Sequence, residues 1–206
     1  MIVLSEIEND ALAELANIGV SKASVALSRI VGDEVAMSVP TVEVVPCAEA
    51  ARRFDAEYAG RLAAVSERFG GSIAGVALLV VPEANCLELV RAALPDEVPP
   101  DEADALAPEA LAEVGNIALN NGLSSMANML GARLDTALPR VLFGNGLEVF
   151  AQCGAEGGPE PTAIVFTTRI RMKARNIPAE IVIAVDAASE EALRARIAAY
   201  VERVLG

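Results

Sequence analysis

The sequence contains no histidine and no tryptophan, and aromatic residues make up only 3% of its 206 positions. Without histidine the chain lacks the commonest general base, and it also lacks the residue on which most catalytic triads and most zinc sites depend. No glycine-rich run is followed by the Gly-Lys-Ser/Thr of a P-loop, and no strand-to-helix G-x-G-x-x-G appears. Imidazole chemistry and the common nucleotide-binding motifs are therefore excluded.

Positive charge is also scarce, because 16 Lys and Arg face 29 Asp and Glu and leave a formal charge of −13. A nucleic-acid-binding protein needs Lys and Arg to neutralise phosphates, and adhesion to anionic lipid needs them as well. The composition therefore argues against nucleic-acid and membrane partners. It favours partners that tolerate or complement an acidic surface.

Three cysteines, Cys47, Cys86 and Cys153, lie far apart and outside any C-x-x-C. Their number and spacing predict reduced, buried thiols in a cytoplasmic protein, and a single reactive thiol is the less favoured alternative because no histidine is present to activate it. The opening "MIVLSEIEND" is too short and too acidic for a signal peptide. The longest apolar run, residues 73–81, is half the length that crosses a bilayer and predicts a buried strand.

An internal repeat is present once these classes are set aside. Residues 11–42, "ALAELANIGVSKASVALSRIVGDEVAMSVPTV", align without a gap to residues 110–141, "ALAEVGNIALNNGLSSMANMLGARLDTALPRV". The offset of 99 is close to half the chain, which indicates a duplicated unit. We therefore predict one domain over residues 1–206, with a first repeat at 1–100 and a second at 101–206.

Each repeat is predicted to begin with a helix of about 25 residues, because apolar residues recur at helical spacing. A capping box at Ser5–Glu8 begins the first helix, and Gly32 and Gly131 end the two helices. Strands are predicted at 34–45, 57–69, 72–81, 133–143, 162–174 and 179–187, and shorter helices at 82–94 and 189–204. The order is helix, three strands, helix, twice. We expect an α+β fold with pseudo-twofold symmetry and one sheet of about six strands.

Both predicted long helices carry the same polar pair, Glu14 with Asn17 and Glu113 with Asn116. Residues three apart project from one face of a helix. One such pair is usually a solvated helix face, but the two repeats have drifted at most other surface positions and still share the Glu, the Asn and a later Pro. Small neighbours are expected to leave an accessible patch around each pair: Ala13, Ala16, Gly19, Ala112, Gly115 and Ala118.

The spacing of these residues resembles the signature of the CheC, CheX and FliY family of chemotaxis phosphatases, Asp/Ser-x3-Glu-x2-Asn-x22-Pro. The first copy reads Asp10, Glu14, Asn17 and Pro40, and the second reads Glu109, Glu113, Asn116 and Pro139. The second copy departs from the signature at Glu109, where the family has Asp or Ser. Two copies resemble the two-site CheC type. The FliY type carries a further C-terminal flagellar-switch domain, which we do not expect here because the sequence ends with the second repeat.

The resemblance implies a hydrolase that removes the aspartyl phosphate of the chemotaxis response regulator CheY. It implies that Asn17 and Asn116 align the attacking water, and that Glu14 and Glu113 pair with the receiver's active-site lysine. An amide suits this task because its oxygen accepts from water and its NH2 donates to a phosphoryl oxygen. Magnesium belongs to the receiver, so no metal or cofactor is expected in this chain. The two prolines are expected to fix the turn into the first strand of each repeat, and Asp10 to cap or orient its pair.

Two other functions stay open. The chain could be a binding module that recognises phosphorylated CheY, or the deamidase CheD, without turning phosphate over. A structural part of the flagellar switch is a weaker alternative. Separately, "RIRMKAR" is expected to place Arg169, Arg171, Lys173 and Arg175 on one face of a strand. A solvated face, or an edge protected by charge, is favoured there over a docking site for an acidic partner.

Overall fold

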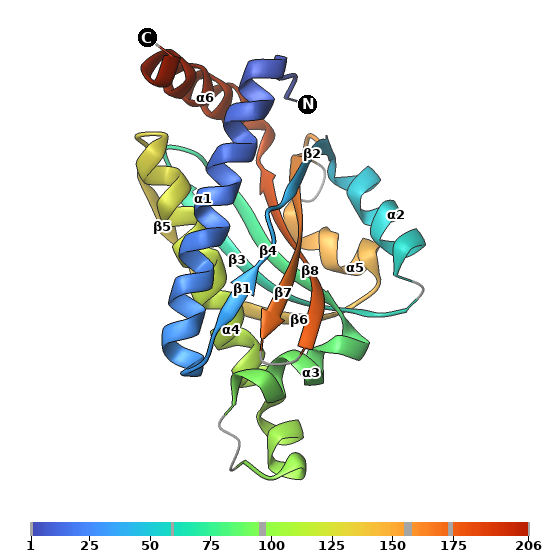
Figure 1. Ribbon diagram of the computed structural model, residues 1–206. Coiled ribbons are helices and arrows are strands. Elements are labelled where there is room, and N and C mark those ends of the chain that lie inside the picture. Colours follow the sequence, from blue (N-terminus) through green and yellow to red (C-terminus); the bar gives the residue numbers. More distant parts are fainter. Residues whose placement is uncertain (1, 59, 95–97, 155–157, 173–174, 206) are drawn as a thin grey trace.

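An antiparallel sheet with helices on both faces organises the chain in the computed structural model (Figure 1). The structure describes residues 2–58, 60–94, 98–154, 158–172 and 175–205. The first repeat contains α1 (Glu6–Val31), β1 (Val35–Met37), β2 (Thr41–Pro46), α2 (Cys47–Glu57), β3 (Leu62–Gly71), β4 (Gly75–Pro82) and α3 (Glu83–Ala93). The second contains α4 (Pro100–Met129), β5 (Leu134–Thr136), β6 (Arg140–Gly144), α5 (Gly146–Phe150), β7 (Thr162–Met172), β8 (Arg175–Val185) and α6 (Glu190–Leu205). The predicted α+β class is confirmed.

The sheet has six strand positions in the order β1-β7-β8-β4-β3-β5, with β2 also paired to β7 and β6 also paired to β3. Each outer position is thus occupied by a broken strand, β1 with β2 at one edge and β5 with β6 at the other. Hairpins β3–β4 and β7–β8 form the centre, where β4 pairs antiparallel with β8. Eight strands in six positions agree with the expected sheet of about six strands.

The two repeats exchange their edge strands. The broken strand of the first repeat pairs with β7 of the second, and that of the second repeat pairs with β3 of the first. Matching hydrogen bonds mark the two breaks: Ser38 N donates to Arg169 O at 3.0 Å, and Ala137 N donates to Arg68 O at 2.8 Å. The register therefore repeats the internal duplication that the sequence predicts, and neither repeat completes its side of the sheet alone.

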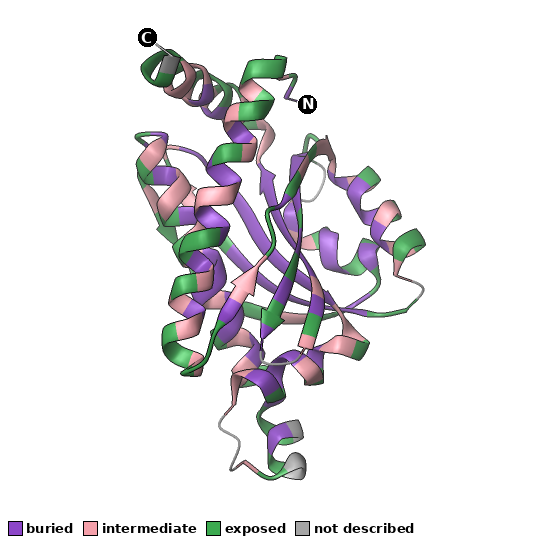
Figure 2. Ribbon diagram, viewed as in Figure 1, coloured by how far each residue is buried: buried purple, intermediate pink, exposed green. Residues whose placement is uncertain are grey.

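Strand β4 explains the long apolar run at residues 73–81. Its side chains alternate between two hydrophobic clusters, so Ala77, Leu79 and Val81 face one cluster while Val76, Leu78 and Val80 face the other. A strand that is buried on both faces has no polar face, and its sequence therefore does not alternate. The first cluster is covered by α1, α3, α4 and α6, and the second by α2 and α5 (Figure 2).

The long helices α1 and α4 lie side by side and run in opposite directions (Figure 1). Ser5 and Glu8 form the predicted capping box, and Gly32 ends α1 in the left-handed conformation at φ 71°. The helix α4 ends at Met129, two residues before Gly131, whose φ is 61°. The helices approach closely at Gly19, where an added Cβ would lie 3.4 Å from the carbonyl oxygen of Gly122.

Two helices were not predicted, so the simple order of helix, three strands and helix is wrong. Helix α2 occupies residues 47–57, and β3 begins only at Leu62 rather than at 57. Helix α5 follows Asn145, because Asn145 and Glu148 form a second capping box. Both helices connect the broken edge strand to the central hairpin and cover the face of the sheet opposite α1 and α4.

Candidate functional site

The first polar pair lies on α1 at positions outside the buried face of that helix, which includes Leu12, Leu15 and Ala16. The side chain of Glu14 is exposed and Asn17 is half-buried. Among the described residues, neither side chain makes a hydrogen bond or an ion pair. The carboxylate and the amide are therefore both available to an incoming group.

The second pair takes the equivalent position on α4. Glu113 is exposed, and within the described ranges it has no ion-pair partner. Asn116 is half-buried and differs from Asn17, because its Oδ1 accepts a hydrogen bond from Asn120 Nδ2 at 2.7 Å. Asn120 Oδ1 in turn accepts from Thr136 Oγ1, on β5, at 2.9 Å. The second amide is thus held from one side while the first is not.

The antiparallel packing keeps the two pairs apart. Asn17 precedes the contact between Gly19 and Gly122 by two residues along α1, and Asn116 precedes it by six along α4. At 1.5 Å per residue, the two asparagines lie about 12 Å apart along the helix axes. The two polar pairs are therefore separate, one on each long helix, and their role as two sites stays a prediction.

The small residues beside the pairs do not form the accessible patch that the sequence suggested. Four of them are buried: Ala16, Gly19, Gly115 and Ala118. Gly19 faces the other long helix, and a Cβ on Gly115 would lie 2.4 Å from Cβ of Val65 on β3. Their small size lets α1 and α4 approach each other and the sheet, which positions the polar pairs without surrounding them.

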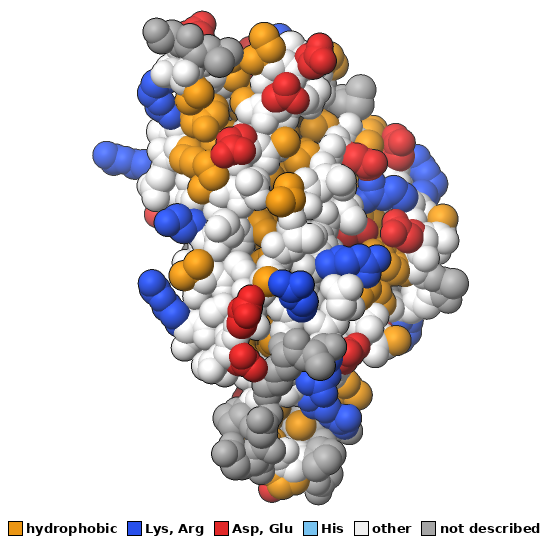
Figure 3. Space-filling model, in the orientation of Figure 1, with side chains coloured by type: hydrophobic (Ala, Val, Ile, Leu, Met, Phe, Trp, Pro, Cys, Tyr) orange, Lys and Arg blue, Asp and Glu red, His pale blue; other side chains and the backbone are white. Residues whose placement is uncertain are grey.

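A groove of about 300 Å³ lies next to the first pair, between α1 and α6. Its lining comprises Ile7, Asp10, Ala11, Glu14, Tyr200, Val201 and Val204. Hydrophobic side chains gather in this part of the surface, where the ends of α1 and α6 meet (Figure 3). Ser5 caps α1, and the exposed carboxylate of Asp10 lies in the wall of this groove beside Glu14, so its role in orienting the pair stays a prediction.

The two motif prolines lie in the breaks of the edge strands. Pro40 separates β1 from β2, and Pro139 separates β5 from β6. The expectation that they fix the turn into the first strand is therefore wrong, because a strand precedes each of them. Proline has no N–H to donate to a ladder, so it suits an interruption at the sheet edge.

The arginines of β7 are solvated, but not at an edge. Arg169 and Arg171 are exposed, and β7 lies between β1–β2 and β8. Arg175 does not share their strand: it begins β8 and pairs with Glu88 on α3 at 3.8 Å. Lys173 lies outside the described residues.

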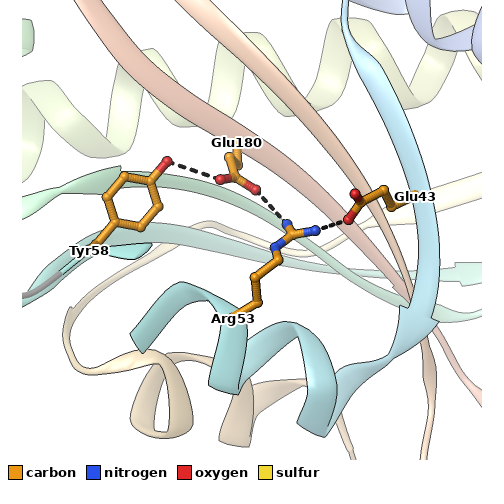
Figure 4. Close-up of polar contacts among 4 residues, drawn as sticks. All are labelled: Glu43, Arg53, Tyr58 and Glu180. Atoms are coloured by element: carbon orange, nitrogen blue, oxygen red, sulfur yellow. Dashed lines mark hydrogen bonds and ion pairs between the residues drawn. The ribbon is translucent and has the colours of Figure 1, made fainter. Parts of the chain in front are cut away.

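The sequence analysis did not find a polar cluster that surrounds the buried Glu180 on the α2 side of the sheet (Figure 4). Arg53 bridges Glu43 and Glu180, and its Nη2 lies 3.0 Å from Glu180 Oε2. Tyr58 donates to Glu180 Oε1 at 3.0 Å. Burial raises the pKa of the Glu180 carboxyl, while Tyr58 and Arg53 act in the opposite direction. Because every member ties α2 to the sheet, the cluster is structural.

The three cysteines are free and buried, as the sequence predicted. Within the described residues, no group of three or more His, Cys, Asp or Glu is placed to hold a metal ion. The same part of the chain has no helix of the length and apolar content that crossing a membrane requires.

Comparison with known proteins found similarity in sequence and in fold. The model of the CheC-like family matches residues 7–44, which contain the first Glu-x2-Asn pair and Pro40. The flagellar motor switch phosphatase FliY of Bacillus subtilis (strain 168) is 26% identical over 166 residues, 79% of this chain. The chain spans only 42% of the length of that relative.

Solved structures share the architecture. FliY of Thermotoga maritima superposes with a TM-score of 0.71 at 21% identity, covering 97% of this chain and 100% of that one. CheX, in a complex with CheY, BeF3 and Mg from Borrelia burgdorferi, reaches a TM-score of 0.50 at 17% identity over 82% of this chain and 95% of that one. The duplicated helices, the curled antiparallel sheet and the matched motif together show that this chain has the fold of the CheC-like family.

Proposed function

We propose that this chain is a phosphatase that hydrolyses the aspartyl phosphate of a CheY-type response regulator. The observation that carries the proposal is the pair of equivalent Glu-x2-Asn sites on α1 and α4. Each presents an exposed carboxylate, without an ion-pair partner among the described residues, one helical turn from a half-buried amide. The similarity to the flagellar motor switch phosphatase of Bacillus subtilis, and the fold shared with the CheX that was crystallised with CheY, support this proposal.

The carboxylates fit a docking role. Glu14 and Glu113 can each accept a cationic side chain from the partner, and the receiver's active-site lysine would form a charge-assisted hydrogen bond there. Such a contact would fix the orientation of the receiver on the helix. The asparagine one turn further along would then enter the phosphorylated site.

The amides of Asn17 and Asn116 fit the positioning of water. An aspartyl phosphate is an activated acyl phosphate, so in-line geometry and charge stabilisation supply most of the catalysis. The amide oxygen accepts from the water, whose oxygen attacks phosphorus. The bond between phosphorus and the aspartyl oxygen breaks, the carboxylate leaves with the bonding electrons, and the water proton passes to the phosphate. The products are a free aspartate and inorganic phosphate.

The partners follow from this chemistry. Magnesium would be held by the receiver, and this chain would contribute no metal or cofactor. Receiver proteins of this kind act in the cytoplasm, where the buried, free thiols also fit. The deamidase CheD is a second candidate partner, and the acidic surface of this chain is compatible with its binding.

The decay of a phosphorylated CheY receiver with magnesium tests the proposal. We expect the wild type to accelerate the release of phosphate, Asn17→Ala and Asn116→Ala each to retain part of the acceleration, and the double variant to lose it. Asn9→Ala on α1 and Asn128→Ala on α4 are matched controls, because both asparagines are exposed and lie outside the pairs.

Binding of a BeF3-activated receiver should be measured beside turnover. Binding without acceleration by the wild type would overturn the phosphatase and leave the non-catalytic binding module. Equal losses in the Asn9 or Asn128 controls would show that the pairs have no special role.

A further inference from the structure

A buried carboxylate lies beneath the second site. Glu67, on β3, is 0% exposed, and neither of its oxygens completes a hydrogen bond within the described residues. The polar side chains that face it are Thr136 and Asn120. These are the two residues that connect by hydrogen bonds to Asn116.

The break in the edge strand creates this position. Ser66 pairs with Arg140 on β6 and Phe69 pairs with Thr136 on β5, so Glu67 lies beside the interruption between these two strands. Its side chain points to the same face of β3 as Val65 and Phe69, which belong to the cluster under α4. Glu67 therefore reaches toward the underside of α4 rather than toward solvent.

The first repeat has no equivalent of this arrangement. Ser21 and Met37 occupy the positions equivalent to Asn120 and Thr136, at the offset of 99. The two sheet registers align Glu67 with Thr168, because the strand break opposite each is equivalent. Thr168 uses its hydroxyl to donate to Ser38 O at 2.8 Å. Within the described residues no such relay reaches Asn17.

Burying a carboxyl group without a hydrogen-bond or ion-pair partner costs free energy of folding. Burial raises the pKa of the Glu67 carboxyl, and its neighbours Thr136 and Asn120 oppose that rise. An apolar residue would pack better at this position of β3, as Val65 and Phe69 do on the same face. Glu67 lies beneath Asn116, whose amide is held by a hydrogen bond, and this position links the buried carboxyl to the second site.

We propose that Glu67, Asn120 and Thr136 form a positioning network that holds the amide of Asn116 in its working orientation. The inference rests on the proposed function and adds that the two sites are unequal. Asn120 occupies one lone pair of Asn116 Oδ1, which leaves the other lone pair for the water and the NH2 for a phosphoryl oxygen. Asn116 is preorganised, whereas Asn17 must lose its rotamer freedom when the receiver docks.

Single-site backgrounds test the network. Asn17→Ala leaves the second site alone, and Asn116→Ala leaves the first. Adding Asn120→Ala should lower kcat roughly five- to tenfold in the first background and leave the second unchanged. KM should stay constant, because docking through the carboxylate is intact. Ser21→Ala, at the equivalent position of the first repeat, is the matched control and should change neither background.

The role of Glu67 is tested in the same way. Glu67→Gln keeps the shape and a hydrogen-bonding group, so it should retain most of the second-site activity, whereas Glu67→Leu should lose as much as Asn120→Ala. An equal fractional loss in both backgrounds, or no loss in either, would overturn the network.

Side-chain dynamics separate this inference from the proposed phosphatase activity. The 15N relaxation of the Asn116 side-chain NH2 should show restricted motion in the wild type and free motion in Asn120→Ala, with Asn17 mobile in both. Restricted motion without phosphatase activity would overturn the proposed function and keep the anchored amide. A mobile Asn116 in the wild type would overturn the network, whether or not the protein is a phosphatase.

Discussion

The packing of α4 on the sheet depends on the absence of one methyl group. A Cβ on Gly115 would lie 2.4 Å from both Cβ and Cγ2 of Val65 and 2.6 Å from Cγ1. Carbon atoms in contact normally lie about 3.5–4.0 Å apart. The Cβ atom of Val65 does not move when the side chain changes rotamer, so no rotamer relieves its clash with the new Cβ at position 115. Gly115→Ala must therefore push α4 away from β3 by about 1 Å.

The magnitude follows from two opposing effects. Overpacking a close-packed core costs about 1–3 kcal/mol, and the branched, backbone-attached contact places this case at the upper end. Alanine is about 1 kcal/mol better than glycine inside a helix. We expect a net loss of about 2 kcal/mol, which corresponds to a fall in Tm of about 4–8 °C for a chain of this size.

The same change at Gly122 is the control. The nearest atom to a Cβ there is the carbonyl oxygen of Gly19, at 4.0 Å. Gly122→Ala should therefore raise Tm by about 2–4 °C, because only the gain in helix propensity remains. Thermal and urea unfolding of the two variants measure both signs.

Turnover gives a second, independent readout of the displacement. A shift of about 1 Å next to Asn116 should reduce second-site activity by up to about 100-fold, measured in the Asn17→Ala background. The close approach of α4 to β3 would be refuted if Gly115→Ala had the stability of the wild type, or if Tm changed in the same direction in both glycine variants.

Three further results follow from buried or capped groups. Arg53→Met should lower the free energy of unfolding in urea by about 3 kcal/mol, because it leaves Glu180 buried without its cation. Glu43→Gln, which removes the exposed partner, should lower it by less than about 1 kcal/mol. A smaller loss for Arg53→Met than for Glu43→Gln would contradict the burial of Glu180. Glu67→Gln should become more stable relative to the wild type as pH rises above about 4.5, because the raised folded pKa of Glu67 means that its carboxyl ionises more readily in the unfolded state and so favours unfolding. Parallel profiles of stability against pH for the two proteins would argue against this. Ser5→Ala should lower stability by about 1 kcal/mol through loss of the cap on α1, and an unchanged unfolding midpoint would exclude that contribution.

Local sequence signals predicted the parts of the fold that depend on local chemistry. The capping box at Ser5, the terminal Gly32 and the apolar run of β4 each act through neighbouring residues, so the helix and the strand were found. The duplicated motif was found because both copies stand in one chain. Helix α5 carried a usable signal that was overlooked, the capping box of Asn145 and Glu148.

Features that depend on distant pairing could not be predicted. In "VSERFGG" of β3, Glu67 is one of three consecutive polar residues, and it is buried only because α4 covers it and the edge strand breaks beside it. The small residues around the motif were misinterpreted for the same reason, since Gly115 faces Val65, which is 50 residues away in the sequence. The link from Asn116 to Thr136 likewise needs the position of β5.

The exchange of edge strands between repeats constrains how such a protein can evolve. Each half supplies a strand that the hairpin of the other half requires, so deletion of either half would expose an unpaired sheet edge. A copy whose Glu and Asn were lost by substitution would still be retained as a scaffold for its sister. Selection can therefore act on the two sites separately while the chain inherits both halves as one indivisible unit, which makes unequal sites a natural outcome of the duplication.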